Sequence, residues 1–199
     1  MQNLNNDFYE NLDINFEEAY KLCNKNFTHE ELLKLLSNGN IPEKQISALY
    51  FDKISNKQDA LALINNLTGC DGKIREAVAH RINYFITNFP ECRVYFDDAK
   101  IFADATIDIN GNICRAIVES TRTLIKNENF SKNYINYIIE FTFEALDELD
   151  KFIFRDKKYV INKQIFKLYW CLEAIKYFQE YIEEDVLLNI LFLRVSMAI

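Results

Sequence analysis

The sequence contains little glycine and proline, the residues that form most turns of β-structure. Its 199 residues include 4 glycines and 2 prolines, whereas a β-sandwich or barrel needs a turn signal roughly every 8–12 residues. It also lacks the glycine-rich turn that holds a dinucleotide phosphate. Both of these fold classes are therefore disfavoured, and the composition favours helices.

Residues with recognisable catalytic or metal-binding spacing are also few. The chain has 2 histidines, and its 5 cysteines form no Cys-x-x-Cys pair. His80 follows Glu76 by one helical turn, which predicts a surface ion pair, and His29 is expected to be exposed. We predict no metal or other cofactor, and a non-enzymatic protein is the favoured reading. The cysteines are expected to be reduced and buried as small apolar side chains.

The net charge of −7 bears on the choice of partners. Non-specific nucleic-acid binding draws its affinity from neutralised phosphates and normally requires a basic face, so the acidic balance disfavours it. The same balance disfavours anionic membrane surfaces and favours a basic protein partner. Residues 1–7 contain neither a basic segment nor an apolar core, so no secretory signal is predicted and we expect a cytoplasmic protein.

Apolar residues recur at helical spacing along most of the chain. Residues 1–13 are polar and are expected to fray, and residues 14–199 are expected to form a single helical-repeat domain. Caps and periodicity predict about ten helices; their approximate ranges are 13–24, 30–37, 42–54, 60–67, 72–89, 97–109, 113–126, 131–152, 162–182 and 185–198. Short loops between such helices predict antiparallel neighbours.

A short motif occurs three times in residues 28–126. In residues 71–82 an acidic residue is followed by an aliphatic–arginine pair, small residues and a second aliphatic residue, at Asp71, Ile74, Arg75, Ala77, Ala79 and Ile82. Weaker copies occupy residues 42–49 and 110–117, the last with Asn110 and Cys114 in place of the acidic residue and the arginine. This pattern resembles the first helix of a HEAT repeat.

The resemblance implies an all-α fold, a short right-handed α-solenoid of antiparallel helix pairs. In such folds each pair is too small to bury its own apolar face, and stacking completes the core. The resemblance also implies that Asp71 and Arg75 join neighbouring repeats.

Five charged residues are candidates for a binding groove in that fold. Arg115, Glu119 and Arg122 share one face of a predicted helix, and Arg75 and Arg81 lie on an earlier helix that would run parallel to it in a solenoid. Arginine is favoured at interface hot spots and in carboxylate or phosphate recognition. The alternative is that these residues form exposed or intramolecular ion pairs.

Aromatic residues crowd the C-terminal half, and most of them are expected in the core. Trp170 and its neighbour Tyr169 cannot both face one apolar stripe, so one of them should reach the surface, and Trp170 is our candidate contact anchor. Residues 186–199 are apolar nearly all round. We expect this segment either to be buried in the stack or to form a homodimer through its outer face.

The favoured function is a protein-binding module or adaptor that presents a concave helical-repeat surface. The alternative implied by the resemblance is an enzyme with a HEAT-like fold, either a DNA glycosylase for alkylated bases or a phycobilin lyase. A glycosylase would require a basic groove with an exposed tryptophan and an aspartate.

Overall fold

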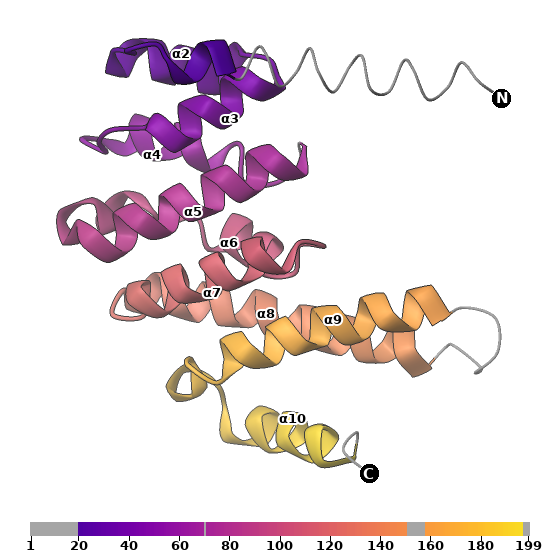
Figure 1. The fold of residues 1–199 in the computed structure, drawn as a ribbon. Coiled ribbons are helices and arrows are strands. Elements are labelled where there is room, and N and C mark those ends of the chain that lie inside the picture. The colour runs from indigo at the N-terminus through magenta and orange to yellow at the C-terminus, as the bar shows by residue number, and fades with distance from the viewer. Residues whose placement is uncertain (1–19, 70, 151–157, 197–199) are drawn as a thin grey trace, which may run out of the picture. The chain divides into compact units, whose positions relative to one another are not determined.

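The structure is a computed structural model that describes residues 20–69, 71–150 and 158–196. Every regular element in these residues is helical and none is a strand (Figure 1), which confirms the all-α prediction. The chain divides into two compact units, Met1–Phe96 and Asp97–Ile199. The fraying predicted for residues 1–13 concerns residues outside those described.

The first unit contains four α-helices and one 3-10 helix in its described part, after a helical turn at residues 20–23. They are α2 (His29–Asn38), α3 (Ile41–Tyr50), α4 (Lys57–Ile64), α5 (Gly72–Asn88) and η1 (Pro90–Tyr95). Helix α2 contacts α3 and α4, and α5 contacts α3, α4 and η1. The short apolar segment at residues 94–96 therefore belongs to a 3-10 turn and its C-terminal cap.

Local capping explains where these helices begin. Thr28 and Glu31 form a capping box, in which the Thr28 Oγ1 accepts from the Glu31 N–H while the Glu31 carboxylate accepts from the Thr28 N–H. Asp71 caps α5 by accepting from the N–H of Lys73 at 2.8 Å. At the end of α2, a Cβ on Gly39 would lie 2.5 Å from the Leu35 carbonyl oxygen, so glycine is required there.

Helix α3 ends earlier than its sequence pattern predicts. The pattern extends to about Ile54, but the helix ends at Tyr50 and residues 51–56 form a loop. The Nε of Arg81, thirty residues away, donates to the Phe51 carbonyl oxygen at 2.6 Å. This contact satisfies a carbonyl at the helix end, so a residue of α5 stabilises the end of α3.

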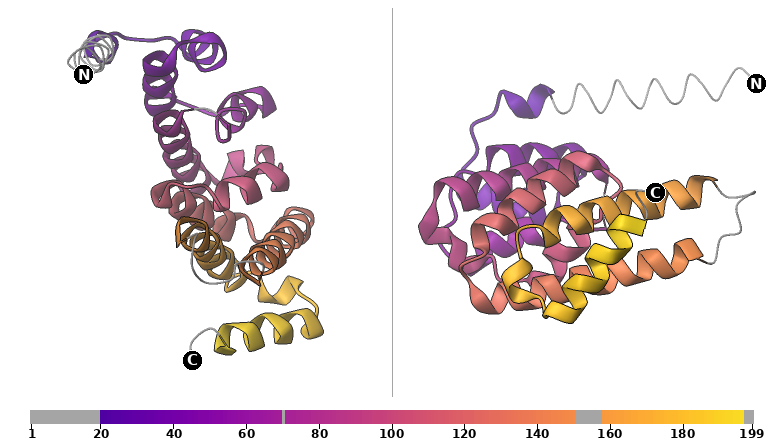
Figure 2. Two further views of the ribbon diagram at one scale, coloured as in Figure 1. Left: turned by 90° about the vertical axis from the view of Figure 1, so that its right-hand side faces the viewer. Right: turned by 90° about the horizontal axis from the view of Figure 1, so that it is seen from below.

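The second unit contains five α-helices and one 3-10 helix in its described part. They are α6 (Ala99–Thr106), α7 (Gly111–Leu124), α8 (Glu128–Asp150), α9 (Lys158–Ile175), η2 (Gln179–Tyr181) and α10 (Glu184–Ser196). Helices α8 and α9 lie side by side (Figures 1 and 2), α6 contacts α7 and α8, and α7 contacts α9. The predicted helix start at residue 131 lies inside α8, where the Ser131 hydroxyl donates to the Ile125 carbonyl.

A continuous set of aromatic rings forms part of the core of the second unit. Phe130 contacts Phe102 and Tyr134 at centroid distances of 5.6 and 5.7 Å, and Tyr134 contacts Phe178 at 5.1 Å. All four rings are fully buried, and each contributes about 1.5–3 kcal/mol to folding. The Tyr134 hydroxyl lies 2.8 Å from the Thr106 hydroxyl, so its polar end is also satisfied. These rings confirm that much of the C-terminal aromatic content is core.

The apolar C-terminal segment forms α10. Ile190 is buried, whereas Leu188 is 56% exposed. The side chains beyond residue 190 lie outside those described, so the homodimer stays a prediction. Among the described helices, none combines the length and apolar character needed to cross a bilayer.

Candidate functional site

Arg81, one of the predicted binding residues, is engaged inside the first unit. Besides its contacts with the Phe51 carbonyl, its guanidinium lies 4.7 Å from the ring centroid of Tyr84 and 4.9 Å from that of Phe85. Partial burial of the guanidinium lowers the pKa of Arg81, although arginine stays charged at neutral pH. Arg81 therefore acts as a structural cation that joins α5 to the end of α3. Arg75 is partly buried on the same helix.

The three predicted residues of α7 lie on the surface. Arg115, Glu119 and Arg122 are all exposed, and their spacing places them on one face of the helix. The Arg122 guanidinium lies 4.9 Å from the ring centroid of Tyr177, which follows α9. This contact orients the Arg122 side chain toward α9 while leaving the residue accessible.

Tyr169, and not Trp170, is the exposed aromatic residue of this part of α9. Trp170 is only 9% exposed, whereas Tyr169 is 55% exposed. The indole packs beside the start of α7, where a Cβ on Gly111 would lie 3.8 Å from the Trp170 Cζ2 atom. That distance is an ordinary van der Waals contact, so the indole lies against the first turn of α7. Trp170 thus does not supply the surface tryptophan that the glycosylase alternative requires.

Helices α7 and α9 together present a surface with many cations. We call this surface the α7–α9 face and define it by the charged, apolar and aromatic residues that these helices and the turn after each expose. They are the cations Arg115, Arg122, Lys126, Lys163 and Lys176, the carboxylate Glu119 with the partly exposed Glu173, and the apolar or aromatic Ile165 and Tyr169. Lys176 is paired with Glu173 at 2.9 Å.

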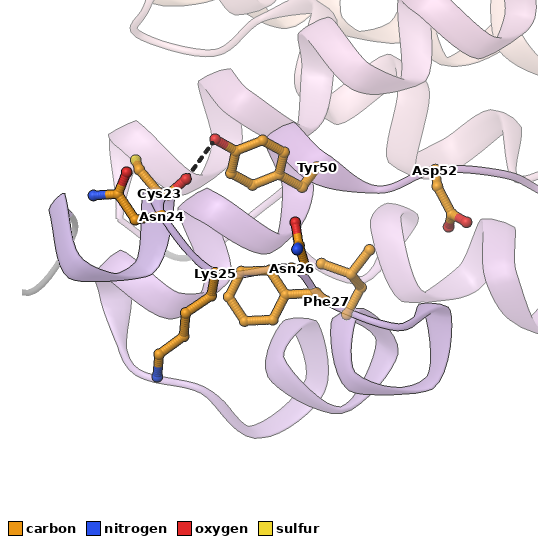
Figure 3. A pocket seen from close by; sticks show the side chains of 8 residues that line it. Cys23, Asn24, Lys25, Asn26, Phe27, Tyr50 and Asp52 are labelled. Carbon is orange, nitrogen blue, oxygen red and sulfur yellow. Dashed lines mark hydrogen bonds between the residues drawn. The ribbon is translucent and has the colours of Figure 1, made fainter.

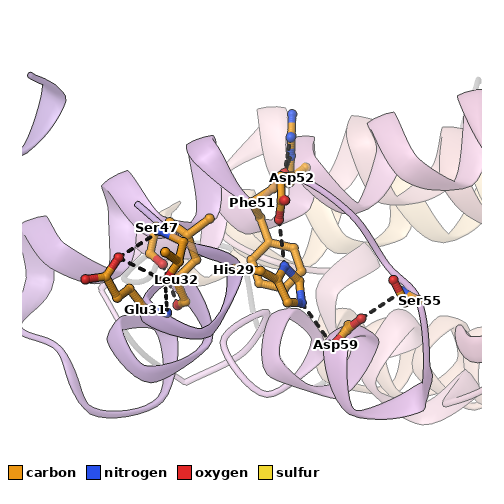
Figure 4. A network of polar contacts seen from close by, with 10 residues as sticks. His29, Glu31, Leu32, Ser47, Phe51, Asp52, Ser55 and Asp59 are labelled. Atoms are coloured by element: carbon orange, nitrogen blue, oxygen red, sulfur yellow. Dashed lines mark hydrogen bonds and ion pairs between the residues drawn. The ribbon is translucent and has the colours of Figure 1, made fainter. Parts of the chain in front are cut away.

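The first unit contains a polar cluster that the sequence did not predict. The His29 Nδ1 lies 2.6 Å from the Asp52 carboxylate, and its Nε2 lies 3.2 Å from the Asp59 carboxylate (Figure 4). The second oxygen of Asp59 accepts from the N–H of Ser55 at 2.7 Å. His29 was expected to be exposed, but its side chain is only 17% exposed. Its ring also packs against that of Phe51, with centroids 5.2 Å apart.

The electrostatics of this cluster favour a charged imidazole. Partial burial of the ring disfavours the imidazolium, but the contacts with Asp52 and Asp59 outweigh this effect and raise the pKa of His29. Burial opposes ionisation of Asp52, but the hydrogen bond to His29 prevails and lowers its pKa. Because both ring nitrogens face carboxylates, neither is available to take a proton from a nucleophile. The cluster is therefore suited to fixing the loop of residues 51–56 between α2 and α4.

Asp52 also lines a cavity of this unit (Figure 3). The cavity has a volume of about 480 Å³, and its walls include Cys23, Lys25, Phe27, Leu32, Tyr50 and Asp52. The Tyr50 hydroxyl donates to the Cys23 carbonyl across it at 3.2 Å. Its mixed lining carries one cation and one anion and indicates no single ligand class. No group of three or more His, Cys, Asp or Glu side chains suited to a metal ion occurs in the described ranges.

The four cysteines in the described ranges comprise one accessible thiol and three enclosed ones. Cys92, Cys114 and Cys171 are buried, as predicted for small apolar side chains. Cys23 is exposed, so the prediction of burial is wrong for this residue. Burial raises the pKa of Cys92 to about 11 and those of Cys114 and Cys171 to about 12. These three thiols are therefore protonated and poorly nucleophilic at neutral pH. Cys70 is outside the described residues.

The chain was compared with known protein families, curated proteins and solved structures. No protein-family model, curated protein or solved structure matches the chain.

Proposed function

We propose that the chain is a HEAT-like helical-repeat protein whose function is to bind another protein. The alternation of helix contacts carries the proposal. In the first unit α2 contacts α3 and α4, while α5 contacts α3 and α4. In the second unit α6 contacts α7 and α8, while α9 contacts α7 and α8. The contacts thus join the members of consecutive pairs (α2 with α3, α4 with α5, α6 with α7, α8 with α9) and helices two apart within each unit, which is the pattern of stacked helix pairs.

The position of the sequence motif also supports this proposal. Its three copies at residues 42–49, 71–82 and 110–117 coincide with α3, α5 and the start of α7. Each of these helices follows and contacts a partner helix, α2, α4 or α6. The copies therefore occupy the same place, the second helix of a pair rather than the first helix that the resemblance suggested.

The exposed side chains fit a role in protein recognition. The α7–α9 face combines two arginines with Tyr169, and arginine and tyrosine are among the residues enriched at binding hot spots. Tyr169 offers a large area with little side-chain entropy to lose. A partner that covered Arg115 and Tyr169 would gain both a charged and an aromatic contact.

Capture from lysate tests the binding function. The tagged full chain is incubated with nuclease-treated host lysate at low and high salt, and retained proteins are identified by mass spectrometry. We expect one protein near stoichiometric amount, with less retained by the Tyr169→Ala variant than by the control Tyr84→Ala, which removes an exposed tyrosine of α5. Equal retention by both variants would remove the α7–α9 face from the proposal, and retention of no protein would contradict the binding function.

Small-angle X-ray scattering tests the repeat arrangement separately. A compact globule of this length has a radius of gyration of about 16 Å. A continuous stack of helix pairs should give a clearly larger radius together with the bell-shaped normalised Kratky plot of a rigid particle. A radius near the globular value, or a plot that rises at high angle, would contradict the solenoid.

A further inference from the structure

Charge in the second unit is separated between its helices. The α7–α9 face carries five cations and two carboxylates, as defined above. On α8 the exposed residues are predominantly acidic, with Glu128, Glu140, Glu144 and Asp147 against Lys132. The net charge of −7 therefore conceals a local surface of the opposite sign. A partner that docks on this surface meets a positive electrostatic potential, whereas the net charge of the chain indicates a negative one.

The register of α7 against α9 places the charged and aromatic residues together. Gly111 packs against the rings of Phe166 and Trp170, and Arg122 lies over the ring of Tyr177. The two helices therefore run in the same direction. Arg115 lies one helical turn after Gly111, which places it level with the turn of α9 that starts at Tyr169. Arg115 and Tyr169 are both exposed there.

The spacing of the two arginines defines what they can recognise. Arg115 and Arg122 are separated by seven residues, or about 10 Å along the helix axis. A peptide in the polyproline II conformation rises about 9 Å per turn of three residues, and every third side chain lies on the same side. Acidic residues at every third position could therefore reach both guanidiniums. Each guanidinium presents a donor fork that matches a carboxylate.

We propose that the α7–α9 face binds a carboxylate-rich segment of a partner protein, with Arg115 and Arg122 contacting its acidic side chains and Tyr169 its apolar ones. This inference rests on the proposed protein-binding function and assigns the partner's chemistry. It replaces the basic partner expected from net charge, because the local surface decides which charge is attracted.

The carboxylates of the face favour a peptide over a nucleic acid. Glu119 lies between the two arginines on the same face, and Glu173 is on α9. Double-stranded DNA carries one charge about every 1.7 Å of its axis, so its phosphates would meet these carboxylates as well as the arginines. A peptide can place neutral residues opposite Glu119 and Glu173.

Fluorescence anisotropy with the full chain tests this assignment. The probe is a labelled peptide with glutamate at every third position and leucine and serine between; reference probes are its glutamine counterpart and a single-stranded oligonucleotide. The double variant Arg115→Gln/Arg122→Gln should bind the acidic peptide about tenfold more weakly than the unaltered chain, as expected for two lost exposed ion pairs. Raising the salt concentration should reduce this difference.

The control variant Lys100→Gln/Lys132→Gln removes the same charge from α6 and α8, where both lysines are exposed in ion pairs with neighbouring acids. It should change affinity less than about twofold, and thermal melts confirm that both variants fold. Any of three results would overturn the assignment. Both double variants could bind the acidic peptide equally weakly, the unaltered chain could bind the glutamine peptide as tightly as the acidic one, or it could bind the oligonucleotide more tightly than the acidic peptide. If the chain retains a protein from lysate but does not bind the acidic peptide, the binding function stands and the acidic-segment assignment fails.

Discussion

Replacing His29 with glutamine should destabilise the first unit by about 2–3 kcal/mol. The imidazole contacts two carboxylates of different exposure, since the Asp52 side chain is 53% exposed and that of Asp59 only 3%. Water screens the contact with Asp52, which contributes at most about 1 kcal/mol. Loss of the cation beside the buried Asp59 leaves that carboxylate with the N–H groups of the backbone and costs about 1.5–3 kcal/mol.

The effect should depend on pH in a direction fixed by the two pKa shifts. The pKa of His29 is raised from 6.5, so its contribution is complete below that value and is lost as the pH rises through the higher value of the folded state. The pKa of Asp52 is lowered from 3.8, so its contribution is present above that value and is lost as the pH falls through the lower folded value. The cost of His29→Gln should therefore be larger near pH 5.5 than near pH 9.

Urea denaturation provides the measurement. Trp170 is the only tryptophan, so its fluorescence reports on the second unit, while far-ultraviolet circular dichroism reports on both. The matched control is His80→Gln, which alters an exposed histidine of α5 and should change stability by less than about 0.5 kcal/mol. A His29→Gln cost as small as that of the control, or one that does not decrease at alkaline pH, would refute the reasoning.

Three other changes have definite expected outcomes. Arg81→Met should cost about 1–2 kcal/mol in the same assay because the Phe51 carbonyl loses its donors; a cost no larger than that of an exposed arginine would contradict this role. Gly39→Ala should cost more than about 1 kcal/mol of stability, because the added Cβ meets a backbone oxygen at 2.5 Å. Gly72→Ala should be neutral or stabilising, because only a side-chain atom lies near the added Cβ, at 4.0 Å. A lower melting temperature for Gly72→Ala than for Gly39→Ala would exclude this explanation. Cys23 should react with a thiol reagent at least about a hundredfold faster than the buried cysteines (Cys92, Cys114 and Cys171), which should react only on unfolding; peptide mapping of the labelled chain measures this, and uniform labelling would show that the core opens readily.

The helical class and several helix starts could be predicted because they depend on nearby residues. Thr28 and Glu31 satisfy one another within a single turn, and Asp71 caps a donor two residues away. Such contacts form in any context that allows the helix, so their residue pattern is enough. Likewise, residues three and four apart share a face, which is why the placement of Arg115, Glu119 and Arg122 on one side of α7 follows from their spacing.

The candidate site depended on packing that no local pattern contains. The apolar periodicity of α3 continues to Ile54, yet the helix ends at Tyr50, where Arg81 holds the carbonyl of Phe51. Only this early end places Asp52 in a loop that His29 can reach. The apolar pattern predicts Asp52 within a helix and His29 on the surface, so the cluster could not be found from spacing.

Which segments are helical, where several of the helices begin and which charges share a helix face follow from local sequence, because the groups involved lie within a few residues of each other. The burial of Trp170 beside an exposed Tyr169, the role of Arg81 inside the first unit and the gathering of cations on α7 and α9 arise from tertiary packing. Each of these depends on which helix a side chain meets, and that is set by burial of apolar surface between residues far apart in the chain.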